Sequence, residues 1–305
     1  MEITQLEAFV AVVEEKSFSR AAVRMLRTQP AISQAIHRLE VWAGEQLLDR
    51  SSKSGVLTAS GQLFYDYAKK VLNLREESRA ALAELRALES GKVTIGANES
   101  TTLYLLPVLK RFRQRHPRVH VAVKRSLSRE IPSALLRYEI DLGILSYNPQ
   151  KPDLESVVVS VDELCLITPR NHRLARSSSV SIRDLGQEQF IAHNISSPYR
   201  ERVIEAFARH HTPLNIAAEL PTIETIKKFV GMGMGIAFVP RMCVQEELAR
   251  QEFAAVPVTD LRIQRKLRLT YRRHASLSAA AQGFLEVARA WAESQPAAGG
   301  VAEGE

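Results

Sequence analysis

Apolar side chains in the first 58 residues recur at helical spacing, in short stretches separated by polar breaks. Between Leu6 and Val13 they recur every three or four residues, which is the pattern of one buried helix face. The polar stretch SFSR interrupts this pattern at residues 17–20, and the small side chains of Ala21 and Ala22 then allow a second helix to pack closely. The pattern predicts a compact helical unit with a tight helix-turn-helix.

The sequence TQPAISQAIHRLE, residues 28–40, predicts a third helix with one apolar and one polar face. Thr28 is a favourable N-cap, and Pro30 is tolerated in the first turn because its missing N–H would have no partner there. The polar face suits the base edges of a DNA major groove, and it equally suits the solvated surface of an ordinary three-helix unit. The candidate DNA contacts on and beside this face are Arg20, Thr28, Gln29, Pro30, Ser33, Gln34, His37 and Arg38.

Two short extended runs, at residues 47–48 and 56–58, surround the polar and basic turn DRSSKSG. This arrangement predicts a β-wing. Arg50 and Lys53 in the turn are candidate contacts to DNA phosphates or to the minor groove.

Residues 59–90 contain no proline and, after Gly61, no glycine, and they carry a seven-residue apolar repeat. Such a repeat is the seam of a coiled coil, which a single helix of about thirty residues cannot bury by itself. We therefore expect a long linker helix that dimerises. The predicted seam positions are Phe64, Val71, Ser78 and Leu85 in one row and Tyr67, Leu74, Ala81 and Leu88 in the other.

Strand and helix patterns alternate from residue 92 to residue 293. KVTIGA, VHVAVK and IDLGILS are predicted strands, separated by helical segments that include STTLYLLPVLKRFRQRHP. A second set of strands includes ELCLIT, QFIAHN, NIAAE, IAFVP and RKLRLTYR. This alternation predicts an α/β fold with parallel, doubly wound sheets.

Composition and charge narrow the class of protein. The 305 residues suffice for about two domains, and 45% apolar with 25% charged residues is typical of a soluble globular chain. The first residues lack the features of a signal peptide, and no stretch offers the roughly 18 apolar residues of a membrane helix. Cys165 and Cys243 cannot form a disulfide framework, which fits a reducing cytoplasm. We therefore expect a cytoplasmic protein that does not contact a membrane.

The net charge of +7 does not mark a DNA-binding region by itself. Residues 1–90 hold 12 Lys and Arg against 12 Asp and Glu, so the whole excess lies in the rest of the chain. The local distribution is more informative, because the segment from Lys16 to Arg38 contains five basic residues and no acidic one.

The sequence LEAFVAVVEEKSFSRAAVRMLRTQPAISQAIHRLE, followed by LLDR and LTASG, resembles the LysR-type transcriptional regulators. The resemblance covers residues 3–62 almost without gaps and extends to the layout of the remaining chain. The sequence has Gln34 where the family often carries Arg, and Arg27 and Thr28 where a hydrophobic residue and Ser are common. These departures leave the preferred DNA site open.

The resemblance implies a winged helix-turn-helix at residues 1–58, a coiled-coil linker helix at 59–90 and a two-lobed, periplasmic-binding-protein-like effector domain at 91–295. Lobe I would comprise residues 91–162 and 264–295, and lobe II residues 163–263, with a disordered tail at 296–305. It further implies a ligand-responsive bacterial regulator that binds an inverted-repeat site on double-stranded DNA. Such a protein forms homodimers and homotetramers, and it contacts RNA polymerase if it is an activator.

Polar side chains follow several predicted strands, at the edge where open α/β sheets bind ligands. Hydroxyls, amides and one arginine from both lobes favour a small anionic metabolite, although each Ser or Thr also suits a helix cap. Glu99 argues against a highly charged anion, and His193 either approaches the cleft or ends a strand. The candidate effector contacts are Asn98, Ser100, Thr101, Thr102, Ser126, Ser128, Arg129, Asn194, Ser196, Ser197 and Thr222.

An enzyme or a solute-binding module is the competing hypothesis for the α/β part. The sequence lacks a G-x-S-x-G elbow, an HExxH motif and a P-loop, so we expect no catalytic residue, metal or cofactor. The stretch VGMGMGIAFVP lies between a predicted helix and a predicted strand, which is the reverse of a dinucleotide-binding loop. Its glycines are expected to turn a helix end into a buried strand. Cys165 lies in the apolar run LCLIT, and no cysteine pair indicates redox sensing.

Overall fold

The computed structural model describes residues 1–49, 56–86, 91–274 and 277–295. Three helices form the N-terminal unit: α1 (Ile3–Glu15), α2 (Phe18–Arg24) and α3 (Gln29–Ala43). Their apolar faces enclose a single core that includes the fully buried Phe9. Thr28 caps α3, because its hydroxyl oxygen accepts a hydrogen bond from the Ala31 N–H at 3.4 Å.

An antiparallel bridge between Leu48 and Leu57 forms the base of the predicted wing. The Asp49 N–H donates to the Val56 carbonyl at 2.8 Å, and the Thr58 N–H donates to the Leu47 carbonyl at 3.1 Å. The turn between these strands lies outside the described residues, and so do its two predicted DNA contacts, Arg50 and Lys53. The predicted tail at residues 296–305 lies outside them as well.

The long helix α4 (Ala59–Arg86) follows the wing. Phe64, one of the predicted seam positions, is partly buried against the N-terminal unit: its ring lies 5.7 Å from that of Phe9, in an edge-to-face arrangement. Tyr67, Val71 and Leu74, by contrast, leave 57%, 38% and 47% of their surfaces exposed. An apolar stripe therefore remains uncovered along this chain. The seam positions from Ala81 onward lie outside the described side chains.

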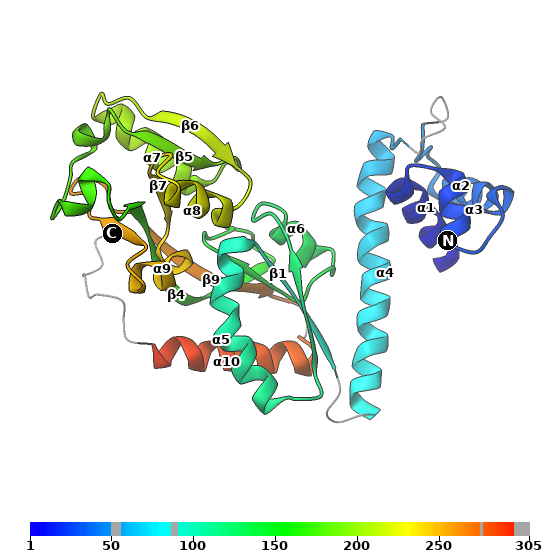
Figure 1. Ribbon diagram of the computed structural model, residues 1–305. Helices are drawn as coiled ribbons and strands as arrows, with labels where there is room; N and C mark the ends of the chain where they lie inside the picture. The colour runs from blue at the N-terminus through cyan, green and yellow to red at the C-terminus, as the bar shows by residue number, and fades with distance from the viewer. Residues whose placement is uncertain (50–55, 87–90, 275–276, 296–305) are drawn as a thin grey trace.

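Helix α4 stands between the N-terminal unit and the α/β part of the chain (Figure 1). It contacts the α/β part through partly buried polar groups. The Glu77 carboxylate lies 3.0 Å from the guanidinium of Arg272, and the Asn73 amide donates to the Arg137 carbonyl at 2.6 Å. The linker helix is thus docked on the domain that follows it.

Lobe I is a twisted sheet with helices on both sides. Its strands follow the order β2-β1-β3-β9-β4, and its core is built around β1 and the apolar faces of two helices that pack on each other. The strands are β1 (Lys92–Ala97), β2 (His120–Arg125), β3 (Leu142–Leu145), β4 (Leu154–Pro169) and β9 (Gln264–Arg272). The helices are α5 (Glu99–Arg115), α6 (Ile131–Leu136) and α10 (Ala279–Ser294).

Lobe II is built on the far half of β4, and two core clusters pack around its strands. Strands β5 and β6 pair in parallel, and a bridge from Phe190 to Ile236 joins them to the strand that follows the glycine turn. The elements of this lobe are β5 (Gln189–His193), α7 (Pro198–Arg209), β6 (Asn215–Leu220), α8 (Ile223–Gly231), β7 (Ala237–Pro240), α9 (Gln245–Ala249) and β8 (Phe253–Val256), with short 3-10 helices at Arg173–Arg176, Ile182–Leu185 and Arg241–Cys243.

The predicted parallel pairing is found for β1 with β2 and β3 and for β5 with β6, but not for β9. Strand β9 pairs antiparallel with β3 and with β4. The chain leaves lobe I along β4 and returns along β9, so these two strands must run in opposite directions. Two antiparallel strands therefore connect the lobes (Figure 1).

The glycine-rich stretch turns the end of α8 into β7, as its pattern predicted. Gly233 and Gly235 have φ values of 78° and 153°, which residues with a Cβ rarely adopt. A Cβ on Gly235 would also lie 2.6 Å from the Gln189 carbonyl oxygen. Gly231 is the last residue of α8, so it forms the predicted helix end, and the positive φ values follow at Gly233 and Gly235.

Candidate functional site

The outer face of α3 presents polar side chains to solvent. Ile32, Ile36 and Leu39 are buried against α1 and α2, so the opposite face of the helix points outward. Every predicted contact on this face is exposed: Thr28, Gln29, Pro30, Ser33, Gln34, His37 and Arg38. Arg20 is exposed too, and its guanidinium donates to the Glu15 carbonyl at the end of α1.

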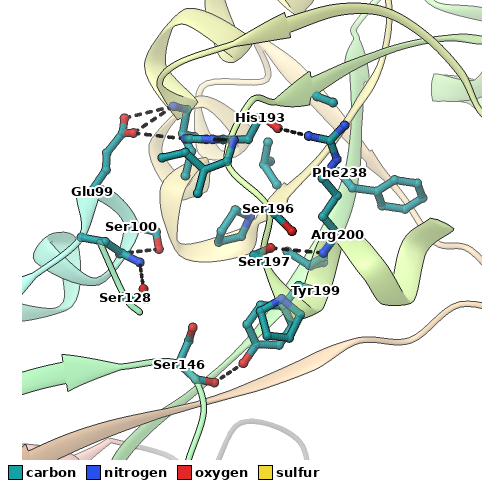
Figure 2. Close-up of a pocket in the computed structure, with 18 of the residues that line it drawn as sticks. Glu99, Ser100, Ser128, Ser146, His193, Ser196, Ser197, Tyr199, Arg200 and Phe238 are labelled. Atoms are coloured by element: carbon teal, nitrogen blue, oxygen red, sulfur yellow. Dashed lines mark hydrogen bonds and ion pairs between the residues drawn. The ribbon is translucent and has the colours of Figure 1, made fainter. Parts of the chain in front are cut away.

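A cavity of about 580 Å³ lies between the two lobes. It opens at the carboxyl ends of β1, β2 and β5, where the polar residues of the predicted effector site follow the strands. Figure 2 shows Glu99, Ser100 and Ser128 on one side of it and His193, Ser196 and Ser197 on the other. The predicted contacts that line this cavity are Asn98, Ser100, Ser126, Ser128, Arg129, Ser196 and Ser197.

The structure places the other four predicted contacts outside the cavity lining, and three of them serve helix ends. Thr101 is fully buried, and its hydroxyl completes the cap of α5 with Asn98. The Thr102 hydroxyl donates to the Asn98 carbonyl at 2.7 Å, and Thr222 caps α8. Asn194 follows β5 without lining the cavity. A hydroxyl just after a strand can either cap a helix or contact a ligand. Only the direction of the side chain decides between these two roles.

Asn98 organises the lobe I wall. Its Oδ1 accepts hydrogen bonds from the Thr101 N–H at 2.9 Å and from the Ser100 hydroxyl at 3.1 Å. Its Nδ2 donates to the Ser128 hydroxyl at 2.7 Å, which links α5 to the segment after β2. The polar wall of lobe I is therefore fixed before any ligand binds.

Arg265 lines the cavity, although sequence reasoning assigned its segment only to a strand. Its side chain is 3% exposed and lies 3.1 Å from the Asp162 carboxylate, and it also donates to the Ser100 hydroxyl at 3.0 Å. Burial raises the pKa of Asp162, while the charge of Arg265 lowers it. The pair joins β4 to β9 where the chain passes between the lobes. No local pattern marks it, because its members are 103 residues apart.

Glu99 spans the cleft. This first residue of α5 extends its carboxylate to the start of α8, where it accepts hydrogen bonds from the Ile223 N–H at 3.0 and 3.2 Å. Helix N-termini attract anions because their first N–H groups lack partners and the helix dipole is positive there. A carboxylate of the protein itself thus occupies an anion-binding position in the cleft.

His193 ends β5 and also lines the cavity, so both of its predicted placements are found. Its Nδ1 accepts from the Ile195 N–H at 3.1 Å, and its Nε2 lies 4.0 Å from the Glu99 carboxylate. Burial lowers the pKa of His193; Glu99 opposes this shift, and the charges of Arg200 and Arg125 add to it. The balance of these effects favours the neutral imidazole.

The lobe II side of the cavity is largely apolar. Phe190 and Phe238 stack with their ring centres 5.8 Å apart, and both line the cavity together with Val203. The Tyr199 ring lies 5.2 Å from the Arg265 guanidinium, and its hydroxyl donates to the Ser146 carbonyl (Figure 2). Sequence reasoning missed these residues, because apolar side chains in strands and helices are ordinarily core.

Cys165 and Cys243 are buried free thiols in one apolar cluster. Burial raises the pKa of each thiol to about 12. Both therefore remain protonated at neutral pH, and the thiolate is the reactive form of cysteine.

Within the described part of the chain, His, Cys, Asp and Glu side chains form no group of three or more that could hold a metal ion. Among its helices, none is both long enough and apolar enough to cross a membrane.

The chain is similar to known proteins over almost its whole length. Residues 3–62 match the family described as bacterial regulatory helix-turn-helix protein, lysR family, and residues 86–293 match the LysR substrate binding domain. A probable RuBisCO transcriptional regulator of Cyanidium caldarium is 32% identical over 283 residues, which cover 90% of this chain and 89% of that protein.

Two solved structures share the fold. The crystal structure of CbnR, a LysR family transcriptional regulator, matches with a TM-score of 0.72 at 22% identity, over 96% of this chain and 99% of that one. The regulatory domain of CcmR from Synechocystis PCC6803, in complex with 2-PG, matches with a TM-score of 0.62 at 27% identity, over 68% of this chain and 99% of that one.

Proposed function

Since the chain belongs to the LysR family of bacterial regulatory helix-turn-helix proteins, we propose that it regulates transcription in response to a small anionic metabolite bound between its lobes. The observation that carries this proposal is the cavity, where a preformed polar wall on lobe I faces lobe II across the carboxyl ends of the strands. CcmR binds 2-PG in its regulatory domain, which supports an anionic effector for this chain.

DNA recognition is assigned to the exposed face of α3. Phosphate contacts position a regulator on DNA and base contacts specify the sequence, so Gln29 and Ser33 are assigned to base edges. The exposed stripe Tyr67, Val71 and Leu74 on α4 would pair with a second copy. A dimer would place two copies of α3 on an inverted repeat, and two dimers would form the tetramer expected for the family.

The cavity is assigned a binding role without turnover. Its buried charged pair, Arg265 with Asp162, holds two strands together. The protein would act in the cytoplasm, and it would contact RNA polymerase if it activates transcription. Ligand binding would shift the population between lobe arrangements, and through α4 the spacing of the two DNA-binding units.

Two experiments test this function in the full-length protein. Footprinting on the DNA beside its own gene should show sequence-selective protection, and that protection should change length when the effector is added. Thermal-shift screening against small acids should identify compounds that raise the melting temperature. An absence of selective protection on any genomic DNA fragment would overturn the proposal, and so would turnover of a bound acid.

A further inference from the structure

The cavity between the lobes has two chemically different ends. The lobe I end is lined by hydroxyl and amide groups, including Asn98, Ser100 and Ser128. The lobe II end, which we name the apolar chamber, is lined by Leu164, Phe190, Val203, Leu214, Ile216 and Phe238. A single occupant that touches both ends must itself have a polar and an apolar part.

The apolar chamber reaches into the core of lobe II. Phe190 and Val203 are only 3% and 6% exposed and belong to the same buried cluster as Phe207. Protein interiors are packed about as densely as organic crystals, so core side chains that border empty space forgo packing contacts. Enclosed apolar cavities stay dry and accept apolar ligands, and the walls of this chamber are apolar in the same way. The chamber is therefore suited to a hydrocarbon group.

The size of the cavity also favours a ligand with a hydrocarbon body. Its volume of about 580 Å³ lies within the range of roughly 300–1,000 Å³ that holds drug-sized ligands. A liquid water molecule occupies about 30 Å³, so an acid of two or three carbon atoms would leave most of the space unfilled.

The charges at the lobe I end favour a negatively charged polar part, because Arg125, Arg129 and Arg265 line the cavity there together with Glu99 and Glu130. The Arg265 guanidinium is buried and fixed, and its Nε has no hydrogen-bond partner among the described residues. The N-terminus of α5 lies on the same wall. Asp162 already offsets the charge of Arg265, and Glu99 adds a second carboxylate to the cleft. Arg125 and Arg129 outweigh these carboxylates, so the wall attracts an anionic group.

We propose that the effector is an amphipathic carboxylate, with its carboxylate beside Arg265 and the start of α5 and its hydrocarbon body in the apolar chamber. The proposal rests on the proposed function, because it takes the cavity as the effector site. It adds the chemical class of the ligand and the orientation in which it lies.

Calorimetric titration of the full-length protein tests this with straight-chain carboxylates from acetate to decanoate, and with malonate as a small dianion. Each added CH₂ buried in the chamber should tighten binding about fourfold, since a buried CH₂ contributes about 0.8 kcal/mol. The gain in affinity per added CH₂ should stop once the hydrocarbon chain fills the chamber. Equal affinity, or no binding, across the whole monocarboxylate series would overturn the inference.

A variant that fills the apolar chamber, and a matched control outside it, show where the hydrocarbon chain binds. Ile216→Trp should reduce octanoate binding at least tenfold and change butyrate binding less than twofold, because Ile216 lines the apolar chamber and its indole replacement would displace a long hydrocarbon chain there. Ile204→Trp should change neither, since Ile204 is on α7, is 44% exposed and does not line the cavity. Leu214→Phe serves as a second filling variant if Ile216→Trp melts well below the wild type. An equal loss of octanoate binding in Ile204→Trp would contradict the proposal.

The outcomes also separate this inference from the proposed function. Malonate binding without any gain along the monocarboxylate series overturns the inference and leaves a sensor of small anions. The proposed function falls only if footprinting also shows no sequence-selective DNA protection.

Discussion

The carboxylate of Glu99 accepts two hydrogen bonds, at 3.0 and 3.2 Å, from the backbone N–H of Ile223, a residue 124 positions later in the chain. Glu99 begins a helix of lobe I and Ile223 begins a helix of lobe II, so this contact fastens the lobes across the cavity mouth. An effector anion that approaches the start of α8 must compete with it.

Glu99→Ala should weaken the contact between the lobes. A hydrogen bond to a charged group contributes about 1.5–3 kcal/mol, and we expect about 1 kcal/mol for this partly exposed side chain. The Ile223 amide should then exchange its hydrogen about fivefold faster, as measured by NMR. Glu130→Ala is the control, because Glu130 lines the same cavity without a hydrogen bond to α8. Unchanged exchange at Ile223 would show that Glu99 does not hold the lobes.

Acidification should destabilise the protein through His193. Its pKa in the folded protein lies below the ordinary value of 6.5, so the unfolded chain takes up a proton first as the pH falls below 6.5. The free energy of unfolding should decrease from there down to the lowered pKa and should be insensitive to this group above pH 7.5. Urea denaturation at several pH values between 5 and 8 measures this free energy of unfolding.

His193→Asn keeps an acceptor for the Ile195 N–H and removes the titrating group. The variant should show a shallower pH dependence than the wild type below pH 6.5. If the free energy of unfolding had the same pH dependence in both proteins, groups other than His193 would cause the acid sensitivity.

Glu77→Gln should loosen the linker helix from lobe I. Arg272 would keep its buried guanidinium but lose its charged partner, and breaking a buried ion pair costs about 3–5 kcal/mol. Glu77 is 21% exposed, so we expect about 2 kcal/mol. Hydrogen exchange should accelerate in α4 near Asn73 and in the segment after α6. Glu76→Gln on the same helix, at a side chain 65% exposed, should leave both regions unchanged.

Leu74→Ser should weaken self-association. Burying a leucine side chain contributes about 1.5–3 kcal/mol, and a symmetric dimer loses it twice, which corresponds to a hundredfold or larger rise in the dimer dissociation constant. Sedimentation equilibrium measures this rise. Ile204→Ser removes an apolar side chain of similar exposure from α7 and should have no such effect. A dimer of undiminished affinity would mean that the stripe on α4 is not the interface.

Gln29→Ala and Ser33→Ala should each weaken binding to the selected DNA site by about 1–3 kcal/mol, the contribution of one base contact. Binding to unrelated DNA should hardly change, because phosphate contacts supply it. Electrophoretic mobility shifts with both DNAs give the ratio of the affinity for the selected site to the affinity for unrelated DNA. Gln62→Ala, on the exposed side of α4, is the control. An equal loss on both DNAs would exclude base recognition by these two side chains.

Local patterns predicted most of the secondary structure. Helical spacing from Leu6 to Val13 gave α1, and the cap and proline at residues 28–30 gave the start of α3. The glycines around 233 were correctly assigned to a turn, because the order of helix and strand and the need for positive φ are local properties. Seven candidate effector contacts line the cavity for a related reason: the strand ends that precede them meet at one sheet edge.

The sequence by itself determined which segments are helices or strands and which family the chain resembles, since spacing, caps and turns act within a few residues. Tertiary structure alone decided which polar group meets which. Arg265 with Asp162, Glu99 with Ile223 and Arg272 with Glu77 join residues far apart in the chain, and each depends on how separate elements dock. The direction of β9 and the apolar chamber were settled the same way, because burial is a property of the packed molecule and not of any segment.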